Sequence, residues 1–320
     1  MANVNLAATV WNCPNYTGEL FMIGANQTPF LNMIGGLQGS TIRTVADFQF
    51  PLAQPWALEA ASQPAISETA SLTAPTPWTY VRAQDVNTCQ IFQTQVSVSY
   101  AKQSVTGSVT ADPTTGLIDI SDDQPVPNER DFQIQAHMRQ ISLDTEYTFL
   151  NGAYTQIINS GVAGGCRGII TACTSNTVAA AAATLGKSLM NQLLRTMAGN
   201  GAEFINPVVF VNAFQKQRLS DIYGYAPEDR NIGGYNIKQV ETDFAVLGIA
   251  WAPQVPAATL LIADLAFCSP VFLPVPEKGV LFYEELSKTG ASEKGQIYGQ
   301  IGLDYGPEEY HGTITNLATS

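Results

Sequence analysis

The architecture of this chain is decided by the stretch VADFQFPLAQPWALEAASQPAISETASLTAPTPWTYVRAQDV, residues Val45–Val86, which is long, poor in charge and interrupted by prolines. Proline removes a backbone donor and breaks helices, so we expect an extended two-stranded flap with a ragged tip. A disordered linker is the alternative. The apolar side chains of the stretch argue against a linker because they are costly to leave in water. They are Trp56, Leu58, Trp78 and Tyr80.

A strand and a long helix follow the flap. In residues Gln90–Tyr100 the side chains Phe92, Thr94, Val96, Val98 and Tyr100 occupy every second position. This period of two is typical of a strand with one buried face. The helix is expected from about Asn128, which can cap its first turn, to Asn151, where Asn151-Gly152 stops it. At about 20 residues this rod spans roughly 30 Å. Its buried stripe is expected to contain Phe132, Ala136, Leu143, Tyr147 and Leu150, with Ile134, Met138 and Ile141 beside it.

The centre of the chain predicts a small α/β subdomain, because short apolar strands alternate with two helices there. Thr184 is expected to cap the first of these helices, which ends at Gly199. Before it, the glycine-rich segment Ser160–Cys173 is expected to be a loop. The later segment Val271–Ile314 returns to the strand period, and we expect it to pair with the strand near Phe92 and to cover the long helix.

Composition excludes several classes of protein. The chain has 320 residues, which exceeds the usual length of a domain with a single hydrophobic core. Two packed subdomains with extensions are therefore expected. Charged residues make up only 13%, against roughly 25% in a typical soluble domain, which indicates a surface covered by neighbours. The net charge of −12 argues against a nucleic-acid reader. No segment is apolar for long enough to span a membrane. The first residues lack a signal core, so we expect a cytoplasmic origin.

One motif suggests chemistry. The segment Ala181–Ser188, AAATLGKS, resembles a phosphate-binding loop, and Asp264 after an apolar run resembles a magnesium-holding aspartate. Such a loop needs glycine-type backbone conformations, which alanine does not easily adopt. We therefore expect Lys187 to be solvated and the nucleotide-binding enzyme to be the weakest of the alternatives.

The remaining candidate groups predict no catalytic, cofactor or metal site. There are two histidines: His137 is expected to be packed or solvated within the long helix, and His311 to lie on the surface. Two acidic pairs are expected to be solvated, and the scattered cysteines to be buried free thiols. These residues are Asp122-Asp123, Glu308-Glu309, Cys13, Cys89, Cys166, Cys173 and Cys268.

Three segments carry a family resemblance: NQTPF at Asn26–Phe30, NTCQIF at Asn87–Phe92, and RQISLDTEYTFLNG at Arg139–Gly152, which closes the long helix. Together they resemble the major capsid proteins of tailed bacteriophages with the Hong Kong ninety-seven fold. The similarity in the order of parts covers nearly the whole chain.

The resemblance implies an α+β phage capsid fold. Residues 1–44 would be the N-arm, 45–88 the E-loop, and 89–180 the first part of the P-domain, with its spine helix at about 128–151. Residues 181–265 would form the A-domain, and 266–320 the return strands of the P-domain. Some members crosslink a flap lysine to a neighbouring asparagine. Residues Val45–Val86 contain no lysine, so we expect noncovalent shell contacts or separate cement proteins.

By resemblance the function is that of a coat protein that self-assembles, as hexamers and pentamers, into the icosahedral head around double-stranded DNA. Assembly in the bacterial cytoplasm, a separate scaffold, a portal and no sequence-specific DNA contact are expected. An encapsulin-type compartment shell is the alternative from the same fold. The candidate intersubunit residues are Trp56, Leu58, Trp78, Tyr80, Arg82 and Asp85, the last two as a pair across subunits.

Overall fold

The computed structural model describes residues 22, 24, 27–37, 43–53, 56–82, 84–104, 108–111, 118–121, 128–223, 229–232 and 235–319. Residues 1–21 of the predicted N-arm, which include Cys13, and the pair Asp122-Asp123 lie outside these residues.

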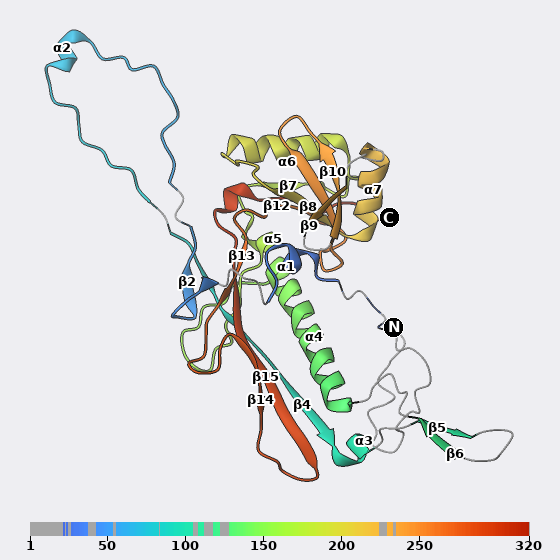
Figure 1. The fold of residues 1–320 in the computed structure, drawn as a ribbon. Coiled ribbons are helices and arrows are strands. Elements are labelled where there is room, and N and C mark those ends of the chain that lie inside the picture. Colours follow the sequence, from blue (N-terminus) through green and yellow to red (C-terminus); the bar gives the residue numbers. More distant parts are fainter. Residues whose placement is uncertain are drawn as a thin grey trace.

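The long helix and the strands around it form the lower half of the molecule (Figure 1). Helix α4, Glu129–Asn151, begins after Asn128, whose side chain accepts hydrogen bonds from the backbone amides of Arg130 and Asp131. Strand β4, Gln90–Ser99, pairs with β15, Ser292–Asp304, in antiparallel register with Phe92 opposite Gly299. Both strands contact α4. The predicted return of the chain to the strand near Phe92 is confirmed.

Three more strands complete this sheet, which has the order β1-β13-β15-β14 with β4 also paired to β15. They are β1, Arg43–Thr44, β13, Ser269–Phe272, and β14, Leu281–Glu285. The short helix α3, Tyr100–Ser104, follows β4. Strands β5, Ser108–Ala111, and β6, Ile118–Ser121, pair as a hairpin between α3 and α4.

The predicted buried stripe of α4 is wrong in part. Tyr147 is 56% exposed and Ala136 is exposed, whereas Thr145 and Glu146 are fully buried. The last turns of the helix are enclosed on several sides, so their buried face is wider than one stripe. Ile134 and Met138 pack against the core as predicted.

Gly152 directly follows the last residue of α4, as predicted, and its φ of −56° is open to any residue. A side chain is nevertheless excluded at this position, because a Cβ on Gly152 would lie 2.2 Å from the carbonyl oxygen of Cys166. The chain then forms a short helix, α5, Ile169–Ala172, inside the segment predicted to be a loop.

The upper half contains a seven-stranded sheet of order β7-β16-β12-β8-β11-β10-β9 (Figure 1). Two of its strands, β7, Thr177–Ala179, and β16, Gly312–Thr315, come from outside the predicted segment 181–265. The others are β8, Pro207–Val211, β9, Asp229–Ile232, β10, Tyr235–Glu241, β11, Val246–Trp251, and β12, Leu260–Asp264. A 3-10 turn, Glu308–Tyr310, precedes β16. The predicted central strands are confirmed.

Helices α6, Lys187–Gly199, and α7, Ala213–Tyr223, cover one face of this sheet. Alternate residues of β8 show the arrangement: Val209 and Val211 pack with the buried side chains of the two helices, whereas Val208 and Phe210 belong to the other core. Gly186, without a side-chain cap, occupies the N-cap position of α6. The prediction that Thr184 caps this helix is wrong.

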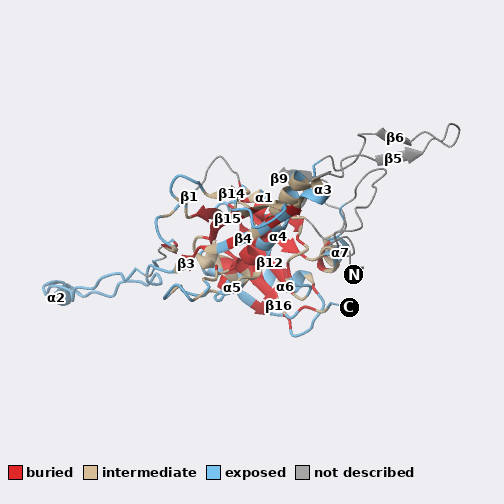
Figure 2. Cartoon of the chain, turned by 90° about the horizontal axis from the view of Figure 1, so that it is seen from below, coloured by how far each residue is buried: buried red, intermediate tan, exposed pale blue. Residues whose placement is uncertain are grey.

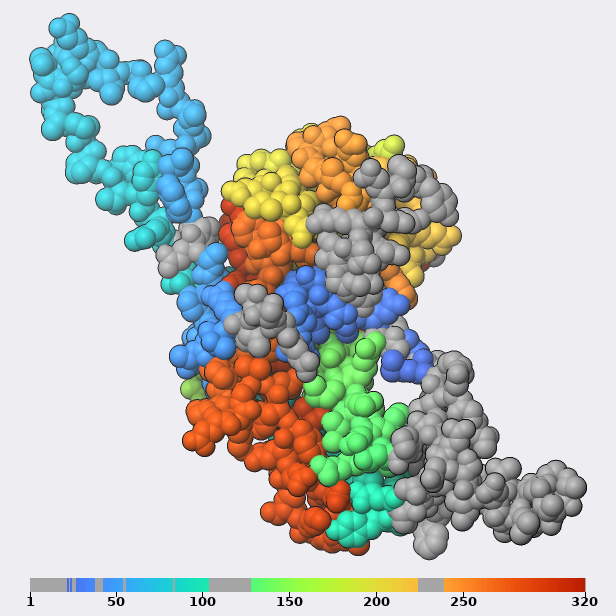
Figure 3. Space-filling model, viewed as in Figure 1, coloured from blue at the N-terminus to red at the C-terminus, as the bar shows by residue number. Residues whose placement is uncertain are grey.

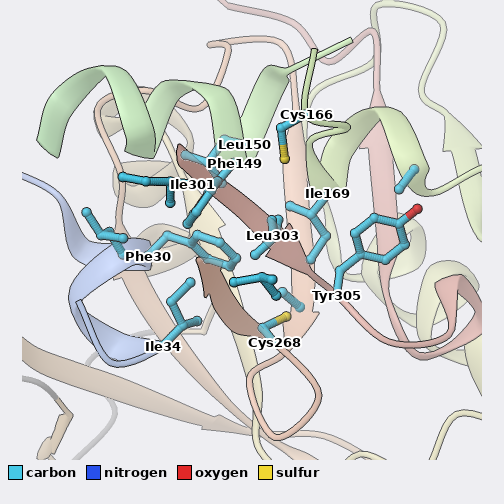
Figure 4. Close-up of a cluster of buried hydrophobic side chains, with 14 of the residues drawn as sticks. Phe30, Ile34, Phe149, Leu150, Cys166, Ile169, Cys268, Ile301, Leu303 and Tyr305 are labelled. Atoms are coloured by element: carbon cyan, nitrogen blue, oxygen red, sulfur yellow. The ribbon is translucent and has the colours of Figure 1, made fainter. Parts of the chain in front are cut away.

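The second face of the sheet packs on the core around α4, so the two halves share one continuous interior. Its residues come from segments far apart in the sequence, including Phe30, Phe149, Ile301 and Leu303 (Figure 4). The rings of Phe30 and Phe210 meet edge to face at 5.3 Å. Buried residues concentrate in this central region (Figure 2).

Part of the predicted N-arm belongs to this core. Helix α1, Pro29–Met33, begins over α4, and its Phe30 and Leu31 are buried. The backbone amides of these two residues donate hydrogen bonds of 3.0 and 2.6 Å to the carboxylate of Glu146. Two of the three family segments, around Phe30 and around Glu146, are therefore in direct contact.

Candidate assembly surface

The flap leaves the body of the molecule as a long loop (Figures 1 and 3). At its root β2, Gln49–Pro51, pairs with β3, Val86–Thr88, and the amide of Leu52 donates to the carbonyl of Asp85 at 2.9 Å. Beyond this bond, no backbone hydrogen bond joins the two limbs within the described residues. The flap is thus two-stranded only at its root, because prolines interrupt the ladder farther out.

A short helix, α2, Glu68–Ser71, forms the tip of the flap. Ser67 caps it by accepting a hydrogen bond from the amide of Ala70 at 3.1 Å. Figure 2 shows the whole outer flap as exposed. Nothing in the described chain packs against the tip.

Three aromatic rings join the two limbs a few residues beyond the root of the flap. Trp56 on the outgoing limb contacts Tyr80 on the returning limb at 5.8 Å, and Trp78 contacts Tyr80 at 4.3 Å. We call these three residues the aromatic cluster. Even so grouped, its rings remain 50 to 58% exposed, and Leu58 remains 67% exposed. An isolated chain therefore presents a large apolar surface to water, which is typical of a surface that binds another protein.

The two charged candidate residues differ in their surroundings. The guanidinium of Arg82 is exposed and has no partner among the described residues. Asp85 forms an ion pair with Arg167 of its own chain, with side chains 52% and 24% exposed. The predicted pairing of Arg82 with Asp85 across subunits is not tested by a single chain, but Asp85 is already paired within it.

Arg167 anchors a polar cluster at the flap root that sequence reasoning missed. Its Nη1 atom also donates to the hydroxyl of Tyr305 at 3.3 Å, and its guanidinium lies 4.8 Å over the ring of Tyr154. The Tyr154 hydroxyl accepts a hydrogen bond of 2.8 Å from Gln49 on β2. Burial raises the pKa of Tyr305 to about 12, so its hydroxyl stays protonated. We call Asp85, Arg167, Tyr154 and Tyr305 the root cluster.

Asn87 fastens the returning limb beneath this cluster. Its side chain is fully buried and donates to the carbonyls of Leu303 and Arg167 at 2.8 and 3.2 Å. Its side-chain oxygen accepts from the amide of Arg167 at 2.7 Å. A buried amide that makes these bonds fixes the position of β3 relative to β15.

The segment resembling a phosphate-binding loop has no free cradle. Ala181 and Ala182 do adopt left-handed conformations, with φ of 49° and 62°, so our argument that alanine would avoid them is wrong. However, the amide of Ala182 donates to Asn316 and that of Ala183 to Ala180, at 2.7 and 2.9 Å. The first of these bonds ties the loop to the residue that follows β16, and the second closes a turn within the loop. Lys187 is exposed, as predicted, with its ammonium 5.3 Å from the ring centre of Tyr223.

Asp264 is likewise a structural residue. It is 1% exposed, and its carboxylate accepts from the amides of Ile205, Asn206 and Ala266 at 2.7 to 3.1 Å. His311 is fully buried beside it, which corrects the predicted surface position, and its Nδ1 accepts from the Asp264 amide at 3.1 Å. Burial lowers the pKa of His311, keeping it neutral.

The other candidate residues have structural surroundings. His137 lies 3.0 Å from the hydroxyl of Thr94, and Glu308 accepts hydrogen bonds from Thr174 and Ser175. Cys89, Cys166, Cys173 and Cys268 are buried free thiols whose pKa values are raised by burial, to about 12 for the first two. Among the described residues there is no group of three metal-ligating side chains and no helix that could cross a membrane.

Comparisons with known proteins agree on one family. The model of the SU10 major capsid protein matches residues 3–318. No curated protein matches the sequence. Among solved structures, a cyanophage A-1(L) capsid is similar at a TM-score of 0.62 and 11% identity, over 99% of each chain. The capsid of a native GTA particle gives 0.60 and 13%, over 99% of this chain and 100% of that one. The SrpI encapsulin of Synechococcus elongatus gives 0.54 and 10%, over 87% and 86%.

At these identities the solved structures establish the fold, and the family model establishes the kinship. An exposed flap, a long helix backed by the β4–β15 pair and a separate sheet subdomain are the parts expected of a phage coat subunit. The chain thus belongs to the SU10 major capsid protein family, with the tailed-phage capsid fold of the Hong Kong ninety-seven type, and is a structural coat protein rather than an enzyme.

Proposed function

We propose that many copies of this chain self-assemble, as hexamers and pentamers, into the closed head of a tailed phage. The head would enclose double-stranded DNA without sequence-specific contacts and would assemble in the bacterial cytoplasm. The observation that carries the proposal is the aromatic cluster, whose rings are half exposed on the part of the flap that extends away from the body of the described chain. A second copy is the surface that would cover it.

The energetics favour this use of the flap. An aromatic side chain buries about 150 to 250 Å² in full, so covering the exposed half of each ring contributes about 2 kcal/mol at about 25 cal/mol per Å². Each subunit both gives and receives a flap in a closed shell, so this contribution recurs at every contact. Trp56, Leu58, Trp78, Tyr80 and Arg82 would be the contacting residues.

The same proposal assigns each segment of the chain to one part of a capsid subunit. The assignments are N-arm 1–44, E-loop 45–88, P-domain 89–180 with 266–320, and A-domain 181–265. Strands β7 and β16 pair within the sheet assigned to the A-domain. Because Val45–Val86 contains no lysine, contacts between subunits would be noncovalent, with separate scaffold, portal and cement proteins where they are needed.

The proposal is tested by electron microscopy and size-exclusion chromatography of the purified chain. We expect shells, tubes or rings from the wild type, and unassembled subunits from the double variant Trp56→Ala with Trp78→Ala. Ile158→Ala is the matched control because Ile158 is an apolar side chain outside the flap that is 73% exposed. A wild type that stays a folded monomer when concentrated, with flap variants behaving identically, would contradict the proposal.

An encapsulin-type compartment is the second candidate, since one such shell shares the fold. The content of particles recovered from the native source separates the two. Nuclease-protected double-stranded DNA identifies a virion head, whereas protein cargo without DNA identifies a compartment.

A further inference from the structure

The direction of the flap is set at its root. The two limbs share no backbone hydrogen bond beyond Leu52 and Asp85 in the described chain, and the aromatic cluster joins the limbs to each other but not to the body. A loop held only at its root rotates about that root unless side chains fix the angle. The contacts of the root cluster therefore decide where the aromatic cluster points.

We propose that Arg167 is the positioning residue of the flap. From the body of the molecule, its Nη1 atom holds both the carboxylate of Asp85 on the returning limb and the hydroxyl of Tyr305. Through Tyr154, over which its guanidinium lies, it also reaches Gln49 on the outgoing limb. One side chain thus links both limbs to the same point of the body.

The geometry distinguishes this role from ordinary packing. Asn87, Phe50 and Leu52 already hold the root strands in place, at 0, 1 and 4% exposure. Asp85, by contrast, lies at the last backbone bond between the limbs and is half exposed. The ion pair therefore adds little to global stability, as is general for partly exposed pairs. However, it lies at the root of the flap, where a small change in the angle of the flap displaces the tip most.

The consequence for assembly is preorganisation. A flap held at one angle does not have to be ordered when it meets a neighbour, so binding loses less conformational entropy. This inference rests on the proposed function, because it assumes that the flap docks on a second copy. The position of the flap within one copy, however, can be measured whether or not shells form.

The test uses two spin labels, at Thr69→Cys on the exposed tip and Ala136→Cys on the exposed side of α4. The four described native cysteines are buried with raised pKa values and should not react. Cys13 is replaced by serine. Labelled chain is diluted into excess unlabelled chain, so that the pulsed electron-spin distances report on single copies.

We expect Arg167→Ala to widen the distance distribution by about twofold and to raise the protein concentration needed for assembly by about tenfold. Arg167→Lys should largely restore the narrow distribution, because a single ammonium nitrogen can replace Nη1 in both contacts. Arg82→Ala, which removes a guanidinium from the same limb but without a described partner, should leave the distribution unchanged. Asp85→Asn tests the same ion pair from the other side if Arg167→Ala is unstable.

An Arg167→Ala distribution as narrow as that of the wild type would overturn the inference, as would equal widening by Arg82→Ala. A lowered melting temperature with an unchanged distribution would show a merely structural residue. Widening of the distribution without any change in assembly would support Arg167 as the positioning residue but contradict the proposed use of the flap.

Discussion

Glu146 is a buried carboxylate that caps the start of α1 from the last turns of α4. Desolvation raises its pKa from 4.5 to about 7, and the hydrogen bonds from Leu31 and Phe30 oppose this shift only in part. An acid whose pKa is higher in the folded state contributes stability that is fully present below pH 4.5. That stability is lost as the pH rises through about 7.

Glu146→Gln should remove this dependence because the amide stays neutral. We expect the difference in unfolding free energy between wild type and variant to change by about 3 kcal/mol between pH 4.5 and 8, with the wild type losing stability toward high pH. Urea denaturation of unassembled chain at a series of pH values measures it. Parallel profiles for the two proteins would contradict the assigned pKa.

Gly302 in β15 provides a second test at the residue scale. A Cβ there would lie 2.7 Å from Cε1 of Phe50 and 3.2 Å from the sulfur of Cys89. Gly302→Ala should therefore destabilise the chain by about 1 to 3 kcal/mol, the usual cost of overpacking a core. Gly290→Ala is the control, since nothing lies within 4 Å of its Cβ position. Equal melting temperatures for both variants would refute the steric argument.

At the scale of elements, α4 depends on its cap at the less buried end. The Asn128 side chain accepts hydrogen bonds from two amides, those of Arg130 at 3.1 Å and Asp131 at 3.5 Å. Asn128→Ala should cost about 1 kcal/mol of unfolding free energy, and Asn128→Ser should restore most of it. Hydrogen exchange should locate the loss in the first turns of α4, and uniform loss along the helix would contradict a local capping role.

The elements that could be predicted from sequence have local signals. The alternation of β4, the cap of α4 and the end of α6 at Gly199 each lie within one segment, and the structure confirms them. The predicted stripe of α4 is wrong at Tyr147 because burial at this end of the helix depends on contacts with α1, α5 and the strands β4 and β15. Local periodicity cannot report how many neighbours enclose a helix.

Some residues of the candidate assembly surface could be predicted from the sequence and others could not. The exposed rings of the flap were predictable from a proline-rich stretch that still contains tryptophan. Arg167 was not, because it lies 82 residues from Asp85, in a glycine-rich segment without periodicity. Asn87 gives no sequence signal either, since its strand reads Val-Asn-Thr, and only the structure shows that its buried amide bonds to Arg167.

At the scale of the whole molecule, charge opposes assembly while the flap favours it. Copies that each carry a net charge of −12 repel one another, and salt screens this repulsion. We expect the protein concentration needed for assembly to fall severalfold between about 0.05 and 0.5 M salt. Light scattering across a salt series measures it. If the protein concentration needed for assembly rose with salt instead, ion pairs between subunits, such as one formed by Arg82, would dominate the contact.

The placement of β16 has a consequence during synthesis. Within the described sheet, β7 has β16 as its sole neighbour, and Thr177 is separated from its partner Thr313 by 136 residues. At about 5 to 20 residues per second, a ribosome needs roughly 7 to 27 seconds to make that interval. Throughout this time the edge of β7 is unpaired on the nascent chain, as is one edge of β12 once residues 260–264 have been made. Such edges are what chaperones shield from aggregation.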